Sequence, residues 1–170
     1  MESIEAETEI IFFPDKYLGS YVASQTGRSL ILYDGYCPTH VRILAADILR
    51  LKQEHPGAEV MVHPECTAEV VALADRTLST GGMCRYAREC SSEELIMGTE
   101  VGLLHRLRKE NPGKRFYPAS EAAVCPNMKR IDLQNVLWSL EEMKHEVRVP
   151  EAVRARAAAA VDRMVETVKA

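Results

Sequence analysis

Six short apolar runs alternate along the chain with longer segments in which apolar residues recur at helical spacing. The runs have the length of strands: Glu9–Phe13, Ser29–Tyr33, Glu59–Val62, Arg76–Leu78, Glu94–Met97 and Lys114–Tyr117. Such alternation is typical of βαβ units, in which each helix returns the chain so that successive strands run parallel. The sequence therefore predicts an α/β fold built around a short parallel sheet.

The segments between the runs carry helix signals. In Thr39–Glu54, one apolar stripe is formed by Val41, Leu44, Ala45, Ile48 and Leu51. Thr39 can cap the start of this predicted helix, and Pro56-Gly57 closes its end. After Pro126 the pattern is helical only, with Asp132 as N-cap of a helix to His145 and a second helix over Pro150–Ala170. We expect C-terminal helices to follow the sheet.

One stretch of the chain repeats. "LKQEHPGAEVMVHPE" at Leu51–Glu65 aligns with "LRKENPGKRFYPASE" at Leu107–Glu121, and each predicts a helix end, a Pro-Gly turn, a strand and a loop that bears a glutamate. Two interpretations stay open. The match reflects either ordinary chemistry of a loop between helix and strand or a fold that reuses similar βαβ modules.

Composition limits the class of protein. The chain has 170 residues, 46% of them hydrophobic, which suits one or two small globular units. No run approaches the roughly 18 apolar residues of a membrane span, and the acidic start "MESIEAETE" lacks the features of a signal peptide, so we expect a soluble, cytoplasmic protein. A net charge of −4 without a basic tract makes nucleic acid an unfavoured partner.

Polar residues without an evident structural role follow the predicted strands. They are Asp34, Cys37, His63, Glu65, Ser79, Thr80, Gly98, Thr99, Ser120, Glu121 and Cys125. Ligands of open α/β sheets bind beyond the carboxyl ends of the strands. We therefore expect these residues to share one rim of the sheet.

Two rim motifs each allow a structural and a functional interpretation. The run His63-Pro64-Glu65 is either a turn before a helix capped by Thr67 or a donor and an acceptor for one polar ligand. The run "LSTGGM" at Leu78–Met83 is either a tight turn or a cradle of backbone N–H groups for a carboxylate or phosphate at a helix N-terminus. No P-loop lysine follows, so a nucleoside triphosphate is not implied.

The five cysteines divide into two groups. In a reducing cytosol they are metal ligands, reactive thiols or buried small residues rather than a disulfide frame. Cys84 and Cys90 fall on different faces of a predicted helix and suit packing, while Cys66 could face either way. Cys37 and Cys125 both lie in rim loops and both precede proline, which stiffens the loop and leaves the sulfur available, as in many iron–sulfur ligand runs.

These motifs together resemble a known family. The ordered segments "FFPDKYLGSYVASQTGRSLILYDGYCPTH", "VMVHPEC", "LSTGGM", "GTEVGLLHRL" and "VCPNMKRIDLQNVLWSLE" are similar to quinolinate synthase, and the resemblance covers about Glu9 to Ala170. It implies three similar αβα domains, each with three layers, about a pseudo-threefold axis, each giving one cysteine to a central 4Fe-4S cluster. On this pattern 1–37 is the end of the second domain, 38–125 is the third domain and 126–170 is a C-terminal helical segment.

The resemblance also implies an activity. Quinolinate synthase is a transferase of NAD biosynthesis that condenses iminosuccinate (iminoaspartate) with dihydroxyacetone phosphate to give quinolinate, phosphate and water. Three cysteines hold three irons, and the fourth iron serves as a Lewis acid. Cys37 and Cys125 match cluster ligands, and His63, Pro64 and Glu65 match a substrate-binding motif in which His63 and Glu65 move protons. Ser79 and Thr80 match a loop that binds a substrate carboxylate or phosphate.

The chain departs from the family in its length, which is about half of a complete quinolinate synthase. The first domain, its cysteine and most of the second domain are missing, and none of Cys66, Cys84 and Cys90 matches the missing ligand. We weigh three hypotheses: a C-terminal piece of a quinolinate synthase, inactive alone; a subunit of a split enzyme with a separate N-terminal half; and a non-catalytic α/β binding module. The implied partners are the two substrates, the N-terminal half, and L-aspartate oxidase as upstream supplier of iminosuccinate.

Overall fold

The computed structural model describes residues 4–169. Two compact units form: one spans Thr8–Cys125, and the other combines the residues up to Glu7 with those from Pro126 onward. Each unit is described by itself. The predicted division of the larger unit at residue 37 stays a prediction.

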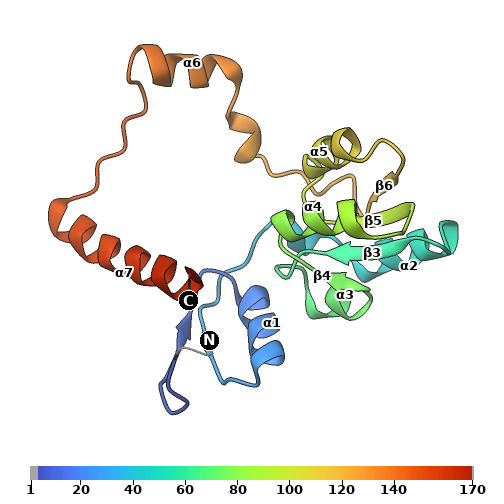
Figure 1. Ribbon diagram of the computed structural model, residues 1–170, viewed down its shortest axis with the longest axis horizontal. Coiled ribbons are helices and arrows are strands. Elements are labelled where there is room, and N and C mark those ends of the chain that lie inside the picture. The colour runs from blue at the N-terminus through green and yellow to red at the C-terminus, as the bar shows by residue number, and fades with distance from the viewer. Residues whose placement is uncertain (1–3, 170) are drawn as a thin grey trace. The chain divides into compact units, whose positions relative to one another are not determined.

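A four-stranded parallel sheet forms the centre of the larger unit, with strand order β4-β3-β5-β6. These strands span Glu59–Val62 (β3), Arg76–Thr77 (β4), Glu94–Gly98 (β5) and Arg115–Pro118 (β6). All neighbours are parallel, and β3 pairs with β5 from Glu59 opposite Leu95 to Val62 opposite Gly98 (Figure 1). The α/β fold with a short parallel sheet is confirmed.

Helices pack on both faces of this sheet, which gives three layers. The helices are α2 (Ala45–Glu54), α3 (Ala68–Ala72), α4 (Thr80–Glu89) and α5 (Leu103–Glu110). On one face, Val60 and Val62 pack with Ile48 of α2 and Val70 of α3. On the other face, a second fully buried set packs with α4 and α5, namely Met61, Met83, Leu95, Met97, Leu104, Leu107 and Phe116. The alternation of buried side chains along each strand explains why the sequence shows short, nearly continuous apolar runs.

The connections identify a switch point in the sheet. The chain leaves β3 for α3 on one face and leaves β5 for α5 on the other, although β3 and β5 are neighbours. Their carboxyl-end loops therefore diverge, and the gap between diverging loops is where open α/β sheets bind ligands. Gly98 ends β5 there, and a β-carbon at Gly98 would lie 2.7 Å from Cγ1 of Val62, so only glycine permits this approach.

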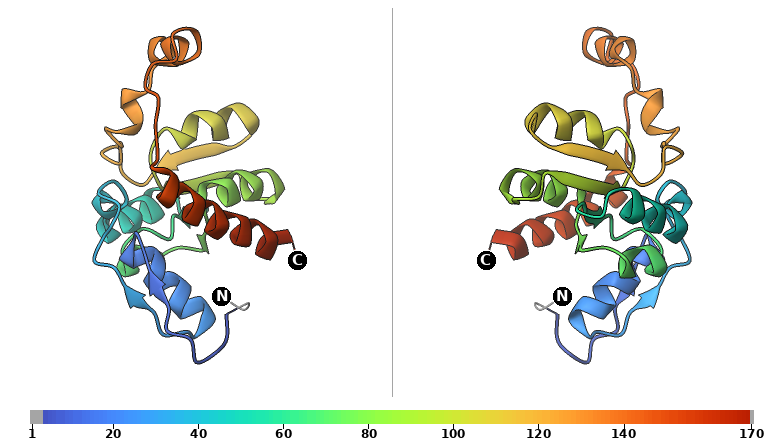
Figure 2. Two further views of the ribbon diagram at one scale, coloured as in Figure 1. Left: turned by 90° about the vertical axis from the view of Figure 1, so that its left-hand side faces the viewer. Right: turned by 90° about the vertical axis from the view of Figure 1, so that its right-hand side faces the viewer.

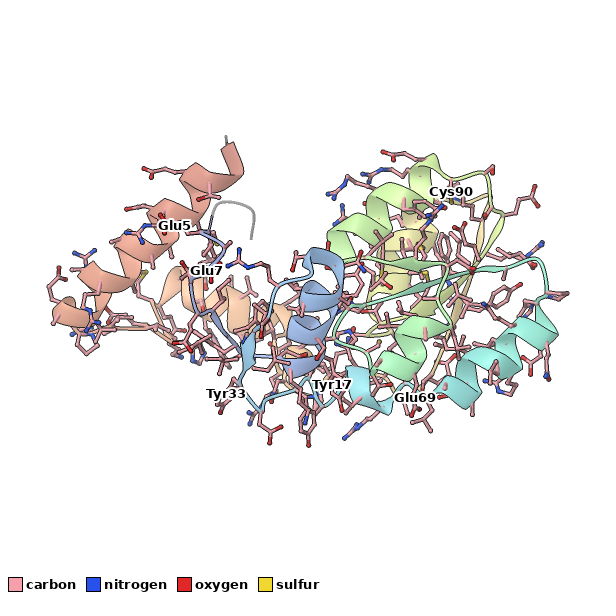
Figure 3. The ribbon with its side chains drawn as sticks, turned by 90° about the horizontal axis from the view of Figure 1, so that it is seen from below. Glu5, Glu7, Tyr17, Tyr33, Glu69 and Cys90 are labelled. Carbon is pink, nitrogen blue, oxygen red and sulfur yellow. The ribbon has the colours of Figure 1, made fainter. Side chains whose placement is uncertain are left out.

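A second, two-stranded parallel sheet is formed by residues that come before the four-stranded sheet in the sequence. It consists of β1 (Ile11–Phe12) and β2 (Ile31–Leu32), joined by α1 (Lys16–Thr26). The helix lies close against this sheet because Gly19 has no side chain where Phe12 and Leu32 approach (Figure 2). Large apolar side chains of this sheet stay exposed: Ile11, Phe13, Ile31 and Tyr33, the last labelled in Figure 3.

The helix predicted over Thr39–Glu54 is wrong at its start. His40–Arg42 forms a single 3₁₀ turn (η1), the chain is extended at Ile43 and Leu44, and α2 begins at Ala45. The Asp47 carboxylate accepts a hydrogen bond from the Leu44 N–H at 3.0 Å and so fixes the later start. As a result Ile43 is buried in place of Leu44, which is exposed.

The repeated segments have the same local geometry. The helix α2 ends at Glu54 with its C-cap His55 at φ −132° and ψ 71°, and α5 ends at Glu110 with Asn111 at −134° and 69°. The His55 N–H donates to the Leu51 carbonyl, and the Asn111 N–H donates to the Leu107 carbonyl. Each turn then leads into a four-residue strand, β3 or β6. This local equivalence fits both interpretations, ordinary chemistry of a helix-to-strand loop and reuse of a βαβ module.

The smaller unit contains only helices among its described residues. They are a 3₁₀ turn, Met128–Arg130 (η2), and the helices α6 (Leu133–Glu141) and α7 (Glu151–Lys169). The predicted N-cap is confirmed, since the Asp132 carboxylate accepts from Asn135 N–H at 2.8 Å, but α6 ends at Glu141, before His145. In the part of the chain that the structure describes, no helix is both long and apolar enough to cross a bilayer.

Candidate functional site

A tight turn after β3 presents His63 and Glu65. The His63 N–H donates to the Gly98 carbonyl at 2.9 Å, which continues the pairing of β3 with β5 by one residue. Glu65 N–H then donates to His63 Nδ1 at 3.3 Å, and Cys66 N–H to the His63 carbonyl at 2.9 Å. Pro64 is buried within this turn. Both side chains are partly accessible, so a polar ligand can reach them.

His40, on η1, completes a polar cluster with this turn. Its Nδ1 lies 2.9 Å from Glu65 Oε2, and its Nε2 lies 3.1 Å from the Thr99 hydroxyl. Its ring stacks on that of His63, with centroids 4.4 Å apart and an interplanar angle of 11°. Because a carboxylate oxygen accepts hydrogen bonds, we assign the His40 proton to Nδ1, and His40 Nε2 then accepts from the Thr99 hydroxyl. We call His40, His63, Glu65 and Thr99 the rim cluster.

Burial favours neutral imidazoles in the rim cluster. Desolvation lowers the pKa of His40, against the opposing charges of Asp15 and Glu100. For His63, desolvation again comes first, the neighbouring His40 lowers the pKa further, and Glu65 and Asp15 act in the other direction. Neutral imidazoles beside a carboxylate can both accept and donate protons near neutral pH. The cluster can therefore move protons to or from a bound ligand.

Cys37 is anchored through its backbone by a buried carboxylate. Asp15, only 3% exposed, caps α1 by accepting from Leu18 N–H at 2.8 Å through one oxygen. Its other oxygen accepts from Cys37 N–H at 2.7 Å. One side chain thus fixes both a helix start and the loop that presents the cysteine.

Cys125 is anchored in the same manner. Glu100, 7% exposed, accepts from Gly102 N–H at 2.7 Å at the start of α5 and from Cys125 N–H at 3.2 Å. The two Cys-Pro loops thus share a device in which a buried carboxylate joins a helix start to a cysteine loop.

The donor chemistry of these loops fits a shared iron–sulfur cluster in part. Cys37 and Cys125 form no disulfide and are of intermediate burial on stiffened loops, and thiolates are the usual cluster ligands. They supply two ligands, whereas a cluster generally takes three or four.

The other three thiols have different surroundings. Burial raises the pKa of the Cys66 thiol to about 12, and its sulfur donates to the Gly98 carbonyl at 3.4 Å. Cys84 is buried between α4 and the sheet. Cys90 follows α4, where its sulfur contacts Lys114 Nζ at 3.2 Å, near the amino ends of the strands and away from the rim (Figure 3). Both Cys84 and Cys90 pack against the same apolar cluster, which agrees with a packing role, but Cys90 is the C-cap of α4 rather than a residue on another face of that helix.

Four other predicted rim residues, Asp34, Ser79, Thr80 and Glu121, are exposed, whereas Ser120 is half-buried and Gly98 is buried. Ser79 is the N-cap of α4, its hydroxyl accepting from Gly82 N–H at 3.2 Å, and it lies with Thr80 at the solvent-exposed start of that helix. Asp34 instead pairs with Lys16 at 2.8 Å, and Glu121 is exposed.

Sequence reasoning did not select His40, Asp15 or Glu100. Asp15 carried a signal, because an aspartate before "KYLGSYVASQ" matches an N-cap ahead of a helix. His40 carried none, since it was assigned to the first turn of a longer helix.

Comparison with known proteins gives a consistent family. Residues 1–166 match the family described as Quinolinate synthetase A protein. A quinolinate synthase of Dehalococcoides mccartyi is 51% identical over 168 residues, covering 99% of this chain and 55% of the relative. Those of Methanosarcina barkeri and Geotalea uraniireducens are 50% and 52% identical, over 97% and 94% of this chain and 54% and 52% of the relatives. The chain spans about half the length of these relatives.

Proposed function

The chain belongs to the quinolinate synthetase A protein family, and on this premise we propose that it forms the C-terminal part of a quinolinate synthase. The complete assembly would condense iminosuccinate with dihydroxyacetone phosphate to quinolinate, a step of NAD biosynthesis. The observation that carries the proposal is the rim cluster at the switch point between β3 and β5, where an α/β sheet binds its ligand.

The rim cluster supplies the proton chemistry that such a condensation needs. Ring formation from these substrates requires proton removal beside a carbonyl and proton delivery to leaving hydroxyl groups. Glu65 can accept a proton, and neutral His63 can hold or return one, while His40, itself bonded to the Thr99 hydroxyl, orients the Glu65 carboxylate. Pro64 restricts the backbone of the turn, so that the His63 and Glu65 side chains can contact the same ligand.

Ser79 and Thr80 would bind an anionic group of a substrate. They start α4, a helix of ten residues, where backbone N–H groups and the helix dipole favour a carboxylate or a phosphate. Their position after β4, next to β3 in the sheet, gives them the same rim as His63 and Glu65.

Cys37 and Cys125 would hold a 4Fe-4S cluster as two of its ligands. When bound, that group supplies a Lewis-acidic iron that polarises substrate oxygen or nitrogen. This chain would hold both cysteine loops in place through the carboxylates of Asp15 and Glu100, which accept from the Cys37 and Cys125 N–H groups. We also propose that 1–37 is the end of a second αβα domain, 38–125 a third, and 126–170 a C-terminal helical segment in a pseudo-threefold enzyme.

Exposed apolar surface supports a chain that acts together with an N-terminal half. The small sheet leaves Phe13 at 72% and Tyr33 at 61% exposure, and in the other unit Leu133 is 89% exposed. A free-standing module would cover such surface. The alternative of a non-catalytic binding module is therefore less favoured, while an obligate subunit of a split enzyme fits equally well. L-Aspartate oxidase would supply iminosuccinate upstream.

The test is reconstitution. The purified chain would be mixed anaerobically with the part of the Dehalococcoides mccartyi relative that it does not match, together with iron and sulfide. The mixture is expected to form quinolinate from iminosuccinate and dihydroxyacetone phosphate, and the chain alone is not. A mixture that assembles a cluster but yields no quinolinate would count against the proposal.

Ligand and proton roles are separated by variants in the same mixture. Cys37→Ala or Cys125→Ala should abolish both iron content and activity, whereas Cys84→Ala should keep both. Glu65→Gln should keep iron content and remove turnover. Unchanged iron in either cysteine variant would overturn the ligand assignment.

A further inference from the structure

Three different metal-ligating side chains converge at the rim without help from another polypeptide. Cys37 comes from the loop after β2, His40 from η1 and Glu65 from the turn after β3. Their sulfur, imidazole nitrogen and carboxylate oxygen all lie within 4.8 Å of one another. One sulfur, one nitrogen and one oxygen form a donor set that suits Zn²⁺, and also Co²⁺ or Fe²⁺, with the fourth tetrahedral position left for water.

The surroundings hold these ligands ready for a single ion. The His40 ring is buried, fixed by its stack on His63, and its Nδ1 already points at Glu65 Oε2. An ion would replace the proton on Nδ1, and Nε2–H would then donate to the buried Thr99 hydroxyl, 3.1 Å away. Ligating histidines usually donate their second ring N–H in this way. Asp15 keeps the Cys37 loop in place through its bond to the backbone.

We propose that Cys37, His40 and Glu65 bind one divalent ion of the Zn²⁺ class in this chain by itself. The site differs from the 4Fe-4S cluster in composition, because it requires Cys37 but not Cys125. Binding of the ion needs no N-terminal half, so it can be measured on this chain without the proposed activity. The two metal groups compete for Cys37, so an ion held here excludes the cluster.

Cobalt titration of the full chain, anaerobic and reduced, tests the proposal. One Co²⁺ per chain should bind, with the intense visible bands of tetrahedral cobalt and a near-ultraviolet thiolate-to-cobalt band, and Zn²⁺ should displace it. Cys37→Ser should remove the thiolate band. His40→Gln and Glu65→Gln should each weaken binding by more than the roughly tenfold expected for Thr99→Val, which removes only the partner of Nε2.

Matched controls make the result decisive. Cys125→Ser changes the other rim thiol and should leave the spectrum and affinity unchanged, as should Cys66→Ser, whose thiol is buried and bonded to Gly98. A thiolate band that survives in Cys37→Ser would overturn the proposal. So would a band lost equally in Cys125→Ser, because that result means that the two Cys-Pro loops bind the ion together. Unchanged circular dichroism shows that each variant is folded, and Thr99→Val tests the site with all three ligands intact.

Discussion

Replacement of Asp15 should destabilise the larger unit more than loss of an ordinary helix cap. Asp15 is buried and accepts two backbone N–H groups, one from Leu18 and one from Cys37. Loss of an N-cap costs about 1 kcal/mol, and loss of a hydrogen bond to a charged group costs about 1.5 to 3 kcal/mol. Asp15→Ala should therefore lower the free energy of unfolding by about 2 to 4 kcal/mol.

Asp15→Ser separates the two contributions. Serine is a good N-cap, but its hydroxyl is too short to serve Leu18 and Cys37 together, so this variant should lose only the bond to the cysteine loop. Urea unfolding gives the free energy, and amide exchange by NMR reports the two N–H groups separately. Both variants should speed exchange at Cys37, and only Asp15→Ala should speed it at Leu18.

The matched control is Asp132→Ala, which removes an exposed cap from α6 in the other unit. It should leave exchange at Cys37 unchanged. The reasoning fails if Asp15→Ala shifts stability by less than about 0.5 kcal/mol, the range of neutral surface substitutions. It fails equally if exchange at Cys37 stays slow in both Asp15 variants.

Three further predictions concern pH, thiol reactivity and strand packing. Burial lowers the pKa of His40 and His63 in the folded state, so the unfolded chain binds more protons and stability should be lost as pH falls below about 6.5. The His63→Gln variant should lose less stability, measured as urea midpoints between pH 7.5 and 5.5. An identical dependence of the midpoint on pH in the variant and the unchanged chain would contradict this prediction. Because the pKa of Cys66 is raised to about 12, native alkylation at pH 8 followed by mass spectrometry should modify Cys37 well before Cys66, and equal rates would refute the burial argument. Gly98→Ala places a β-carbon 2.7 Å from Val62 and should lower the free energy of unfolding in urea by about 1 to 3 kcal/mol. Gly57→Ala has open space around the new β-carbon and should not lower it. Equal effects of the two variants would show that β3 and β5 do not approach tightly at Gly98.

The sheet could be predicted because its signal is local. Every predicted strand appears within a few residues of its expected bounds, and His63 and Glu65 lie together because both belong to the turn that directly follows β3. The late start of α2 was missed because the apolar stripe continues through Leu44, while the deciding bond comes from Asp47. His40 was missed for a different reason: its partners Glu65 and Thr99 are distant in sequence, and only the fold brings them together.

The anchors of the cysteine loops show the same limit. The proline that follows each of them distinguishes Cys37 and Cys125 from the other cysteines in the sequence. Asp15 and Glu100, which hold their backbones, lie more than twenty residues earlier and precede helices, where an acidic residue is ordinary. Their second role appears only when the loops fold back onto the helix starts.

Quinolinate formation by the reconstituted mixture tests the central claim most directly when two glutamates of this chain are compared. Glu65 belongs to the rim cluster, and Glu69 lies four residues later, exposed on α3 (Figure 3). Each glutamine variant removes one negative charge from the same stretch of chain. We predict that Glu65→Gln abolishes product while Glu69→Gln retains it. Equal activity of the two variants would contradict the assignment of catalysis to the rim between β3 and β5.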